Sequence, residues 1–433
     1  MFRSLGFACM ALLALAACNK TPSHPNDSLN AVARDYVKLS LTIGEKEAGY
    51  VDAYYGPPEL QAAAKADAAK ASLEALSTRV DALKKRAQAF TSNGDGMDVR
   101  RAKFLDAQLT AATTRLRMMR GEKLSFEDEA QGLFSVRPQL QPLESFDPVI
   151  AKIDALVPGS GPLPRRVDAF SNRFNIPKDK LKPVFDAAIA ECRRRTLEHI
   201  KLPANERFDM AFVTGKSWSG YNYYQGNNHS KIEINTDLPI RISRAVDLGC
   251  HEGYPGHHVL NSLLEEKLTK GRKWVEFSVY PLYSPQSLIA EGSANYGIKL
   301  AFPGKEQVEF EKRMLYPLAG LPAAEAEKYY ELQQALQGLA GARFTISQMF
   351  LDGKVTEDQA LQLFQKYQLL TVERARKTLD FTKQYRSYVI NYGLGQDMAQ
   401  AAVEAAGTDP KARWARMEKI LSEPTLPSDL AAR

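Results

Sequence analysis

The chain has 433 residues, of which 44% are hydrophobic and 25% are charged, so it is long enough to bury one large or two ordinary hydrophobic cores. Lysine and arginine together number 57 and aspartate and glutamate 51, which gives a formal net charge of +6. Because the basic residues are spread along the chain without a polybasic block, we expect no nucleic-acid partner.

The first 17 residues have the features of an export signal peptide. One arginine precedes an apolar run from Leu5 to Ala17, which is too short for a hydrocarbon core that needs roughly 20 helical residues. Small residues lead into Cys18, so the segment resembles a lipoprotein signal, in which this cysteine is lipidated and anchors the protein to a membrane. Asn19 follows where an aspartate would indicate inner-membrane retention, so we expect an outer-membrane anchor facing the periplasm. Polar residues 18–30 predict a tether.

Residues 31–200 predict a helical scaffold domain. Apolar side chains recur there at three- and four-residue spacing, and clusters of glycine and proline separate the helical segments. Cys192 in this half and Cys250 in the next could pair in an oxidising periplasm or remain buried free thiols. The sequence leaves both alternatives open.

Residues 201–433 predict a second, catalytic domain that begins with a small antiparallel sheet. Apolar and aromatic residues alternate across residues 208–235, and residues 225–230 are rich in glycine and asparagine, as in a turn. The strand that holds Ile232 and Ile234 is either an exposed edge that pairs with an extended peptide or a part of the core.

Helical periodicity resumes after the sheet and continues almost to the end of the chain. One helix is predicted to start at Thr356, where Gln359 would complete a capping pair. The expected fold class is therefore mainly α (α+β), with a small antiparallel sheet.

Three of the six histidines lie within eight positions, in Cys250-His251-Glu252-Gly253-Tyr254-Pro255-Gly256-His257-His258. A helix carrying His-Glu-x-x-His places two imidazoles one turn apart, so both reach one zinc ion while the glutamate acts as general base. Here His251 and Glu252 supply the first half, but His257 is six residues further on, about 240° around a regular helix. Because Pro255 cannot donate to the carbonyl of His251, we expect a bulge that makes His257 the second ligand. His258 remains the alternative second ligand, or a residue that supports the site.

A catalytic zinc ion usually takes three protein ligands and keeps one position for water. Glu291 is our candidate for the third ligand, because the glycine and alanines around it would let its helix pack closely against the histidine helix. Glu265, Glu266 and Glu276 compete with it on pattern alone.

These residues resemble a bacterial family, the domain of unknown function 885 family, in which His-Glu-x-x-Pro-Gly-His-His is followed by Glu-Gly-Trp-Ala. The second motif is matched at Glu291, Gly292 and Ala294, and a third element at Tyr392-Gly393-Leu394-Gly395-Gln396. The resemblance covers about residues 218–396 and implies a zincin-like helical metallopeptidase body. The chain departs from the family at three positions, namely Ser293, Ser347 and Leu351, which puts its specificity or activity in question.

In the peptidase interpretation His251, His257 and Glu291 hold Zn²⁺, and Glu252 transfers protons to and from the reacting groups. The resemblance implies Tyr392 as donor to the oxyanion, with two further phenols as alternatives, Tyr388 and Tyr296. Either of two arginines, Arg386 or Arg343, could hold a carboxylate of a peptide substrate.

Two other functions fit the same residues. The chain could be a non-catalytic metal-binding envelope lipoprotein, although a purely structural zinc has no need of Glu252 beside an open position. It could also be a zinc amidase that acts on cell-wall or other non-peptide amides. The sequence leaves open the native metal, endo- or exopeptidase cleavage, and the oligomeric state.

Overall fold

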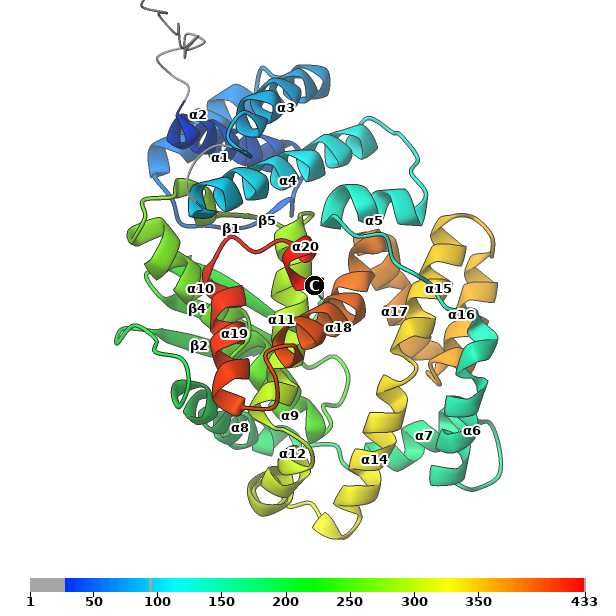
Figure 1. Ribbon diagram of the computed structural model, residues 1–433. Helices are drawn as coiled ribbons and strands as arrows, with labels where there is room; N and C mark the ends of the chain where they lie inside the picture. The colour runs from blue at the N-terminus through cyan, green and yellow to red at the C-terminus, as the bar shows by residue number, and fades with distance from the viewer. Residues whose placement is uncertain (1–27, 93–95, 432–433) are drawn as a thin grey trace, which may run out of the picture.

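The computed structural model describes residues 28–92 and 96–431, and within them the chain is mainly helical with two small sheets (Figure 1). This architecture confirms the expected mainly α fold with a small sheet. The signal peptide, Cys18 and most of the tether lie outside the described residues. In the described part, no helix is both long and apolar enough to cross a membrane.

Five helices from the N-terminal half form a layer over one end of the molecule (Figure 1). They are α1 (Leu29–Lys46), α2 (Pro58–Ala68), α3 (Leu73–Gln88), α4 (Gly96–Met119) and α5 (Phe126–Phe134). α1 begins after Ser28, whose hydroxyl accepts a hydrogen bond from the amide of Ala31. Strand β1 (Val51–Tyr54) leaves this layer and pairs antiparallel with β5 (Val279–Pro281) from the second half of the chain.

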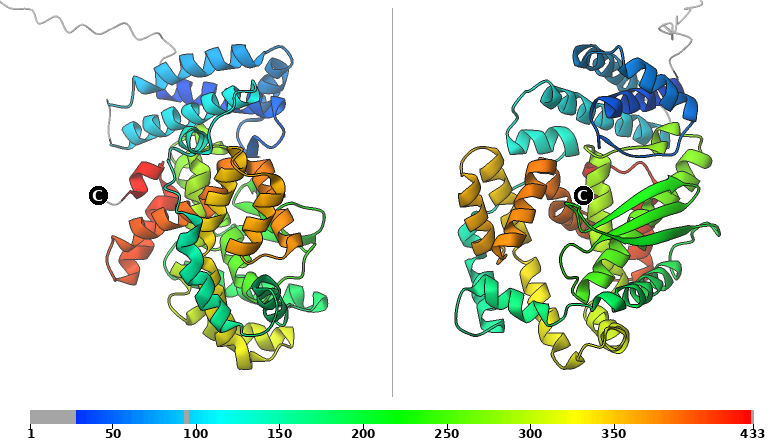
Figure 2. Two further views of the ribbon diagram at one scale, coloured as in Figure 1. Left: turned by 90° about the vertical axis from the view of Figure 1, so that its right-hand side faces the viewer. Right: turned by 180° about the vertical axis from the view of Figure 1, so that it is seen from behind.

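The larger sheet has three strands, β2 (Arg207–Val213), β3 (Gly220–Gly226) and β4 (His229–Asn235), in the order β2-β4-β3 (Figure 2). β3 and β4 form the predicted antiparallel hairpin, and two asparagines at its turn have positive φ, as a tight type I′ turn requires.

β2 pairs with β4 in parallel, so the prediction of a wholly antiparallel sheet is wrong for this ladder. Alternation of apolar residues shows which segments are strands, but it carries no information on their relative direction. β4 is also the central strand, with Ile232 and Ile234 buried, so the edge-strand interpretation of this segment is wrong.

A further group consists of α11 and the helices that pack against it. They are α8 (Leu181–Leu197), α9 (Ser243–Leu248), α10 (His257–Leu264), α11 (Pro285–Ala301), α18 (Ile390–Glu404), α19 (Pro410–Ser422) and α20 (Pro427–Leu430). α11 runs through the middle of the molecule and packs most extensively against α18 (Figure 1). Its 17 residues are almost all buried, which explains why it shows little amphipathic pattern.

The remaining helices lie mainly on one side, around a second, smaller hydrophobic core (Figure 1). They are α6 (Asp147–Leu156), α7 (Leu163–Asn172), α14 (Ala326–Gln337), α15 (Ala340–Leu351), α16 (Glu357–Tyr367) and α17 (Val372–Tyr385). Two short helices, α12 (Glu306–Phe310) and α13 (Tyr316–Ala319), contribute their buried residues to the larger core. The predicted capping pair is present at the start of α16, where the side chains of Thr356 and Gln359 each bond the other's amide.

The larger core runs from α1 through the sheet to α11 and α19 without interruption near residue 200. The predicted boundary between a scaffold domain and a catalytic domain at that point stays a prediction.

Candidate metal centre

The histidine segment is an interrupted helix. α9 continues into a π-helical turn, η3 (Gly249–Gly253), the chain breaks at the cis peptide bond between Tyr254 and Pro255, and α10 restarts at His257. The amide of Gly256 donates to the carbonyl of Cys250 at 3.1 Å. A Cβ at position 256 would lie 1.7 Å from the carbonyl oxygen of His251, so only glycine fits this approach.

A disulfide between Cys192 and Cys250 links α8 to the π-helical turn. Of the two alternatives for these cysteines, the structure therefore shows the paired form. The bond fixes the residue directly before His251 to a neighbouring helix.

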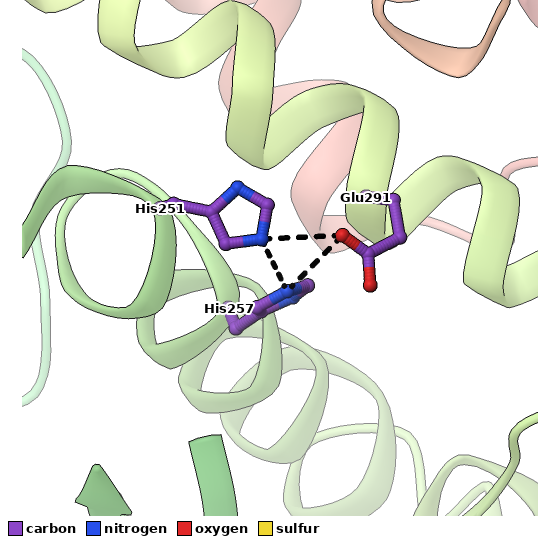
Figure 3. Close-up of side chains that lie close together, drawn as sticks. All are labelled: His251, His257 and Glu291. Atoms are coloured by element: carbon purple, nitrogen blue, oxygen red, sulfur yellow. Dashed lines mark hydrogen bonds and ion pairs between the residues drawn. The ribbon is translucent and has the colours of Figure 1, made fainter. Parts of the chain in front are cut away.

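The structure brings His251, His257 and Glu291 together, although they come from η3, α10 and α11 (Figure 3). The Nε2 atoms of the two histidines are 3.1 Å apart. The Oε2 atom of Glu291 lies 3.2 Å from Nε2 of His251 and 3.7 Å from Nε2 of His257. A tetrahedral zinc ion with ligands at about 2.0–2.1 Å has edges of about 3.3 Å between ligand atoms. The three donor atoms have the spacing of one face of such a site.

Asn295 determines which nitrogen of His251 carries its proton. The Nδ2 of Asn295 donates to the carbonyl of Tyr392 at 2.8 Å, so its Oδ1, 2.9 Å from Nδ1 of His251, is left as an acceptor. His251 therefore donates from Nδ1 and presents a lone pair at Nε2, as a metal ligand does.

Glu291 is also held by a neighbour. The hydroxyl of Tyr388 donates to its Oε1 at 2.7 Å, while Oε2 is buried without a hydrogen-bond partner among the described residues. Burial opposes its charge, but the two imidazoles outweigh this effect and hold the pKa of Glu291 well below its usual range. The lowered pKa reflects imidazole N–H groups that face the carboxylate, and a cation held between the neutral rings and Glu291 would take the place of these protons.

Glu252 stands next to this cluster, with its side chain buried against β3. A Cβ at Gly220 would lie 2.7 Å from its Oε1, and Asn222 donates to its backbone carbonyl at 2.7 Å. Burial, reinforced by the charge of Glu291, raises the pKa of Glu252 to about 7, against the opposing effect of His251. A carboxyl group that titrates near neutral pH can both accept and return a proton.

The three tyrosines have different surroundings. Tyr388 is occupied with Glu291, whereas the ring of Tyr392 lies 6.4 Å from the ring of His251 and lines the same cavity. Tyr296 lies on α11, where burial and the charge of Glu404 raise its pKa to about 12. The placement of Tyr392 suits a donor to reacting groups better than that of the other two.

His258, the alternative second ligand, is turned away from the donor cluster. It is fully buried, with Nδ1 2.8 Å from Oγ of Ser230 and Nε2 3.0 Å from Oε2 of Glu206. Burial opposes the charge of Glu206, but bonds from His258, Tyr254 and Arg193 outweigh it and lower the pKa of Glu206 to about 2. The contacts of His258 tie α10 to β4 and to Glu206, so this residue supports the site and does not join the donor atoms.

The two candidate arginines differ in their partners and in their position relative to the cavity. Nε of Arg386 donates to Oε2 of the buried Glu129 at 2.7 Å, and Arg386 does not line the cavity. Arg343 lines the cavity and has no carboxylate partner among the described residues.

The competing glutamates have other partners. Glu265 accepts from the amides of Asn227 and Asn228, Glu266 pairs with Lys270, and Glu276 pairs with the buried Arg101. None of them joins the histidines.

The three residues that differ from the motifs of the resembled family, Ser293, Ser347 and Leu351, contact other parts of the protein and not the cavity. Ser293 donates to the carbonyl of Ala290, Ser347 lies 3.3 Å from the hydroxyl of Thr382, and Leu351 packs against the larger core. None of the three lines the cavity.

The sequence interpretation missed two residues near the site. Asn295 is four residues after Glu291 on α11, so helical spacing alone could have placed both on one face. Asp52 on β1 lines the cavity, where burial raises its pKa to about 6 and the hydroxyl of Tyr221 opposes the shift. No pattern around Asp52 points to it, because it reaches the site only through the pairing of β1 with β5.

These groups open into one cavity of about 1580 Å³, lined from both hydrophobic cores. This volume exceeds the roughly 300–1,000 Å³ of ordinary small-molecule sites. The cavity is therefore large enough for a ligand of several residues.

No family model matches the chain, and no curated protein matches it. Among solved structures, a lipoprotein from Colwellia psychrerythraea is similar over 83% of this chain and 68% of its own, with 12% identity and a TM-score of 0.52. Metallocarboxypeptidase 1 of Trypanosoma cruzi aligns over 91% of each chain, with 12% identity and a TM-score of 0.45. Of these two, only the first exceeds a TM-score of 0.5, and at this identity it bears on the fold alone.

Proposed function

We propose that this chain is a zinc-dependent hydrolase that cleaves peptide bonds. The observation that carries the proposal is the convergence of three lone-pair donors, two Nε2 atoms and the unsatisfied Oε2 of Glu291, beside Glu252 in a large cavity. Imidazole and carboxylate together suit zinc. When bound, zinc would supply Lewis acidity that polarises a carbonyl group and makes water more acidic.

In this proposal each residue of the site has a separate role. His251, His257 and Glu291 hold the ion, with Asn295 and Tyr388 fixing the orientation of His251 and Glu291. Glu252 takes a proton from the attacking water and returns it to the leaving amine. Tyr392, which lines the cavity beside the ring of His251, donates to the developing oxyanion.

Elemental analysis and peptide-library cleavage would test these roles, with His251→Ala, Glu252→Gln and, as control, His229→Ala. His229 lies on β4 and pairs with Asp209, outside the cluster. We expect about one zinc ion per chain, lost in His251→Ala, retained without cleavage in Glu252→Gln, and retained with full cleavage in the control.

Three results would contradict the proposal in different ways. Absence of metal after zinc reconstitution would remove the site itself. Stoichiometric zinc without cleavage of any peptide would favour the metal-binding lipoprotein. Release of amines from cell-wall amides, with peptides left intact, would favour the amidase.

We also propose that the protein is anchored in the outer membrane through lipid on Cys18 and faces the periplasm. Support comes from the sequence before Cys18 and from the disulfide, which requires an oxidising compartment. Mass spectrometry should find acyl chains on Cys18, and Cys18→Ser should release the protein from membranes. A Cys18→Ser variant that stays membrane-bound would contradict the anchor.

A further inference from the structure

Arg343 on α15 is a half-buried cation that has no carboxylate partner among the described residues. Its guanidinium lies against two aromatic rings, with the central carbon 5.0 Å from the ring centre of Phe381 and 6.0 Å from that of Tyr392. Its Nε is buried and has no acceptor among the described residues. Contact with the rings favours a guanidinium, but it does not give the Nε–H group an acceptor.

Arg101, which is buried, and Arg386, which is half-buried, both have carboxylate partners. Arg101 bonds Glu276 at 2.9 Å, and Arg386 bonds Glu129 at 2.7 Å. Burying a charge is costly unless it is paired and hydrogen-bonded, and Arg101 and Arg386 follow this rule. The exception at Arg343 lies on the wall of the cavity that holds the metal cluster, so a ligand in this cavity can supply the missing anion.

A single aromatic ring separates Arg343 from the metal cluster. The ring of Tyr392 contacts the guanidinium on one side and stacks at 6.4 Å from the ring of His251 on the other. A residue of extended peptide spans about 3.3–3.6 Å. An anion held by Arg343 would therefore lie within a few residues of a peptide bond placed at the metal cluster.

We propose that Arg343 binds the C-terminal carboxylate of a peptide, so that the enzyme releases residues from the C-terminus. This inference rests on the proposed peptidase function and adds its substrate class. A planar guanidinium matches a carboxylate with two parallel N–H···O bonds, which gives direction as well as affinity. Phe381 beside Arg343, and Tyr385 next to Phe381, line the same cavity and favour an apolar C-terminal side chain.

Calorimetric titration with N-acetyl-Ala-Phe and with its C-terminal amide would test the site separately from catalysis. The full-length Glu252→Gln protein prevents turnover, and Arg343→Gln and Arg343→Lys are added to it. Arg374→Gln serves as control, because Arg374 lines the same cavity but pairs with Asp168 at 3.2 Å.

We expect the acid to bind about 10- to 100-fold more tightly than the amide. Arg343→Gln should abolish this preference, Arg343→Lys should retain only part of it because an ammonium cannot bond bidentately, and Arg374→Gln should leave it unchanged. The unaltered enzyme should release phenylalanine from the acid and leave the amide intact.

The outcomes separate the two proposals. Equal binding of acid and amide, a preference that survives Arg343→Gln, or no binding of either peptide would overturn the carboxylate site. Cleavage of amidated peptides as fast as free ones would leave the hydrolase standing and overturn the C-terminal specificity. An acid preference that depends on Arg343, without cleavage by the unaltered protein, would retain the site and remove the peptidase function.

Discussion

Asn295 shows how a single side chain outside the donor set can decide whether the set binds metal. Its amide is fixed by the carbonyl of Tyr392, and this bond leaves its oxygen free to accept from Nδ1 of His251. Without that acceptor, the imidazole could carry its proton on Nε2, which would then repel a cation. Asn295 orients His251 in the same way that Tyr388 orients Glu291.

Replacing Asn295 with leucine should weaken zinc binding about 10- to 100-fold, because His251 loses the partner that fixes its proton and its ring. Competition with a chromogenic chelator would measure the dissociation constant. Asn205→Ala, on an exposed loop, should leave this constant unchanged. An Asn295→Leu protein with unaltered affinity would show that the donor set is self-sufficient.

The two tyrosines near the cluster should respond differently to loss of their hydroxyls. Tyr392→Phe should keep its zinc and lose about 10²–10³-fold in kcat, because a donor to the oxyanion is removed. Tyr388→Phe should lose zinc affinity, because Oε1 of Glu291 loses the bond that positions it. Metal content and kcat measured on both variants would reveal a reversal of these roles.

At the scale of elements, α11 and α18 pack unusually closely through two glycines. A Cβ at Gly292 would lie 2.3 Å from the carbonyl carbon of Gly395, and a Cβ at Gly395 would lie 2.7 Å from the carbonyl oxygen of Leu288. This close approach places Tyr388 and Tyr392 against Glu291 and Asn295. The glycines of the second and third sequence motifs therefore serve one helix contact.

Gly292→Ala should force the two helices apart. Overpacking of this kind costs about 1–3 kcal/mol or more, and the same movement should withdraw Tyr388 from Glu291 and lower the zinc content. Gly96→Ala, where a Cβ meets nothing within 4 Å, is the matched control. Unchanged thermal unfolding and zinc content in Gly292→Ala would contradict this account of the contact.

Local patterns predicted helices and strands well, and long-range pairing poorly. The capping pair at Thr356 and the β3–β4 turn depend on residues close in sequence, and both were predicted. The parallel pairing of β2 and the central place of β4 depend on strands packing in space, which alternation does not encode. Asp52 was not predicted either, because its place at the cavity depends on the pairing of β1 with β5.

At the scale of the whole molecule, the wall of the cavity holds buried ionisable side chains, which an ordinary hydrophobic core would exclude. Glu311 begins the π-helical turn η6 (Glu311–Leu315) and lines the cavity, yet it is only 2% exposed. Burial, with a smaller contribution from Asp247, raises its pKa to about 8, although Gln307 donates to it at 2.9 Å. The folded protein therefore holds a proton that the unfolded chain releases well below neutral pH.

The pH dependence of stability follows from this proton. Because the pKa of Glu311 is higher in the folded state, its contribution to the free energy of unfolding decreases as pH rises from about 4.5 to about 8. Glu311→Gln should remove this decrease. At pH 8 and above, the free energy of unfolding of this variant should exceed that of the unaltered protein by on the order of a few kcal/mol. Urea unfolding at pH 5 and pH 8, with the exposed Glu331→Gln as control, would measure the difference. Parallel pH profiles for the two variants would contradict it.

The donor set of the candidate site could be named from the sequence, because a dense histidine cluster with a glutamate is an uncommon pattern. The sequence did not reveal the π-helical turn between α9 and the cis peptide bond, or that Arg386 pairs with Glu129 whereas Arg343 lines the cavity. Both depend on which buried groups find partners, and a sequence does not state this.

Helix α11 meets a different neighbour at each step between Glu291 and Gly297. Glu291 faces the histidines, Gly292 meets α18, Asn295 bonds His251 and Tyr392, and Gly297 lies against Pro255, where a Cβ would approach to 2.8 Å. One residue inserted or deleted in this segment would rotate everything beyond it by about 100°. During divergence, substitutions at the more exposed Ile298 and Lys299 can accumulate, whereas any change in the length of α11 would break several of these contacts at once.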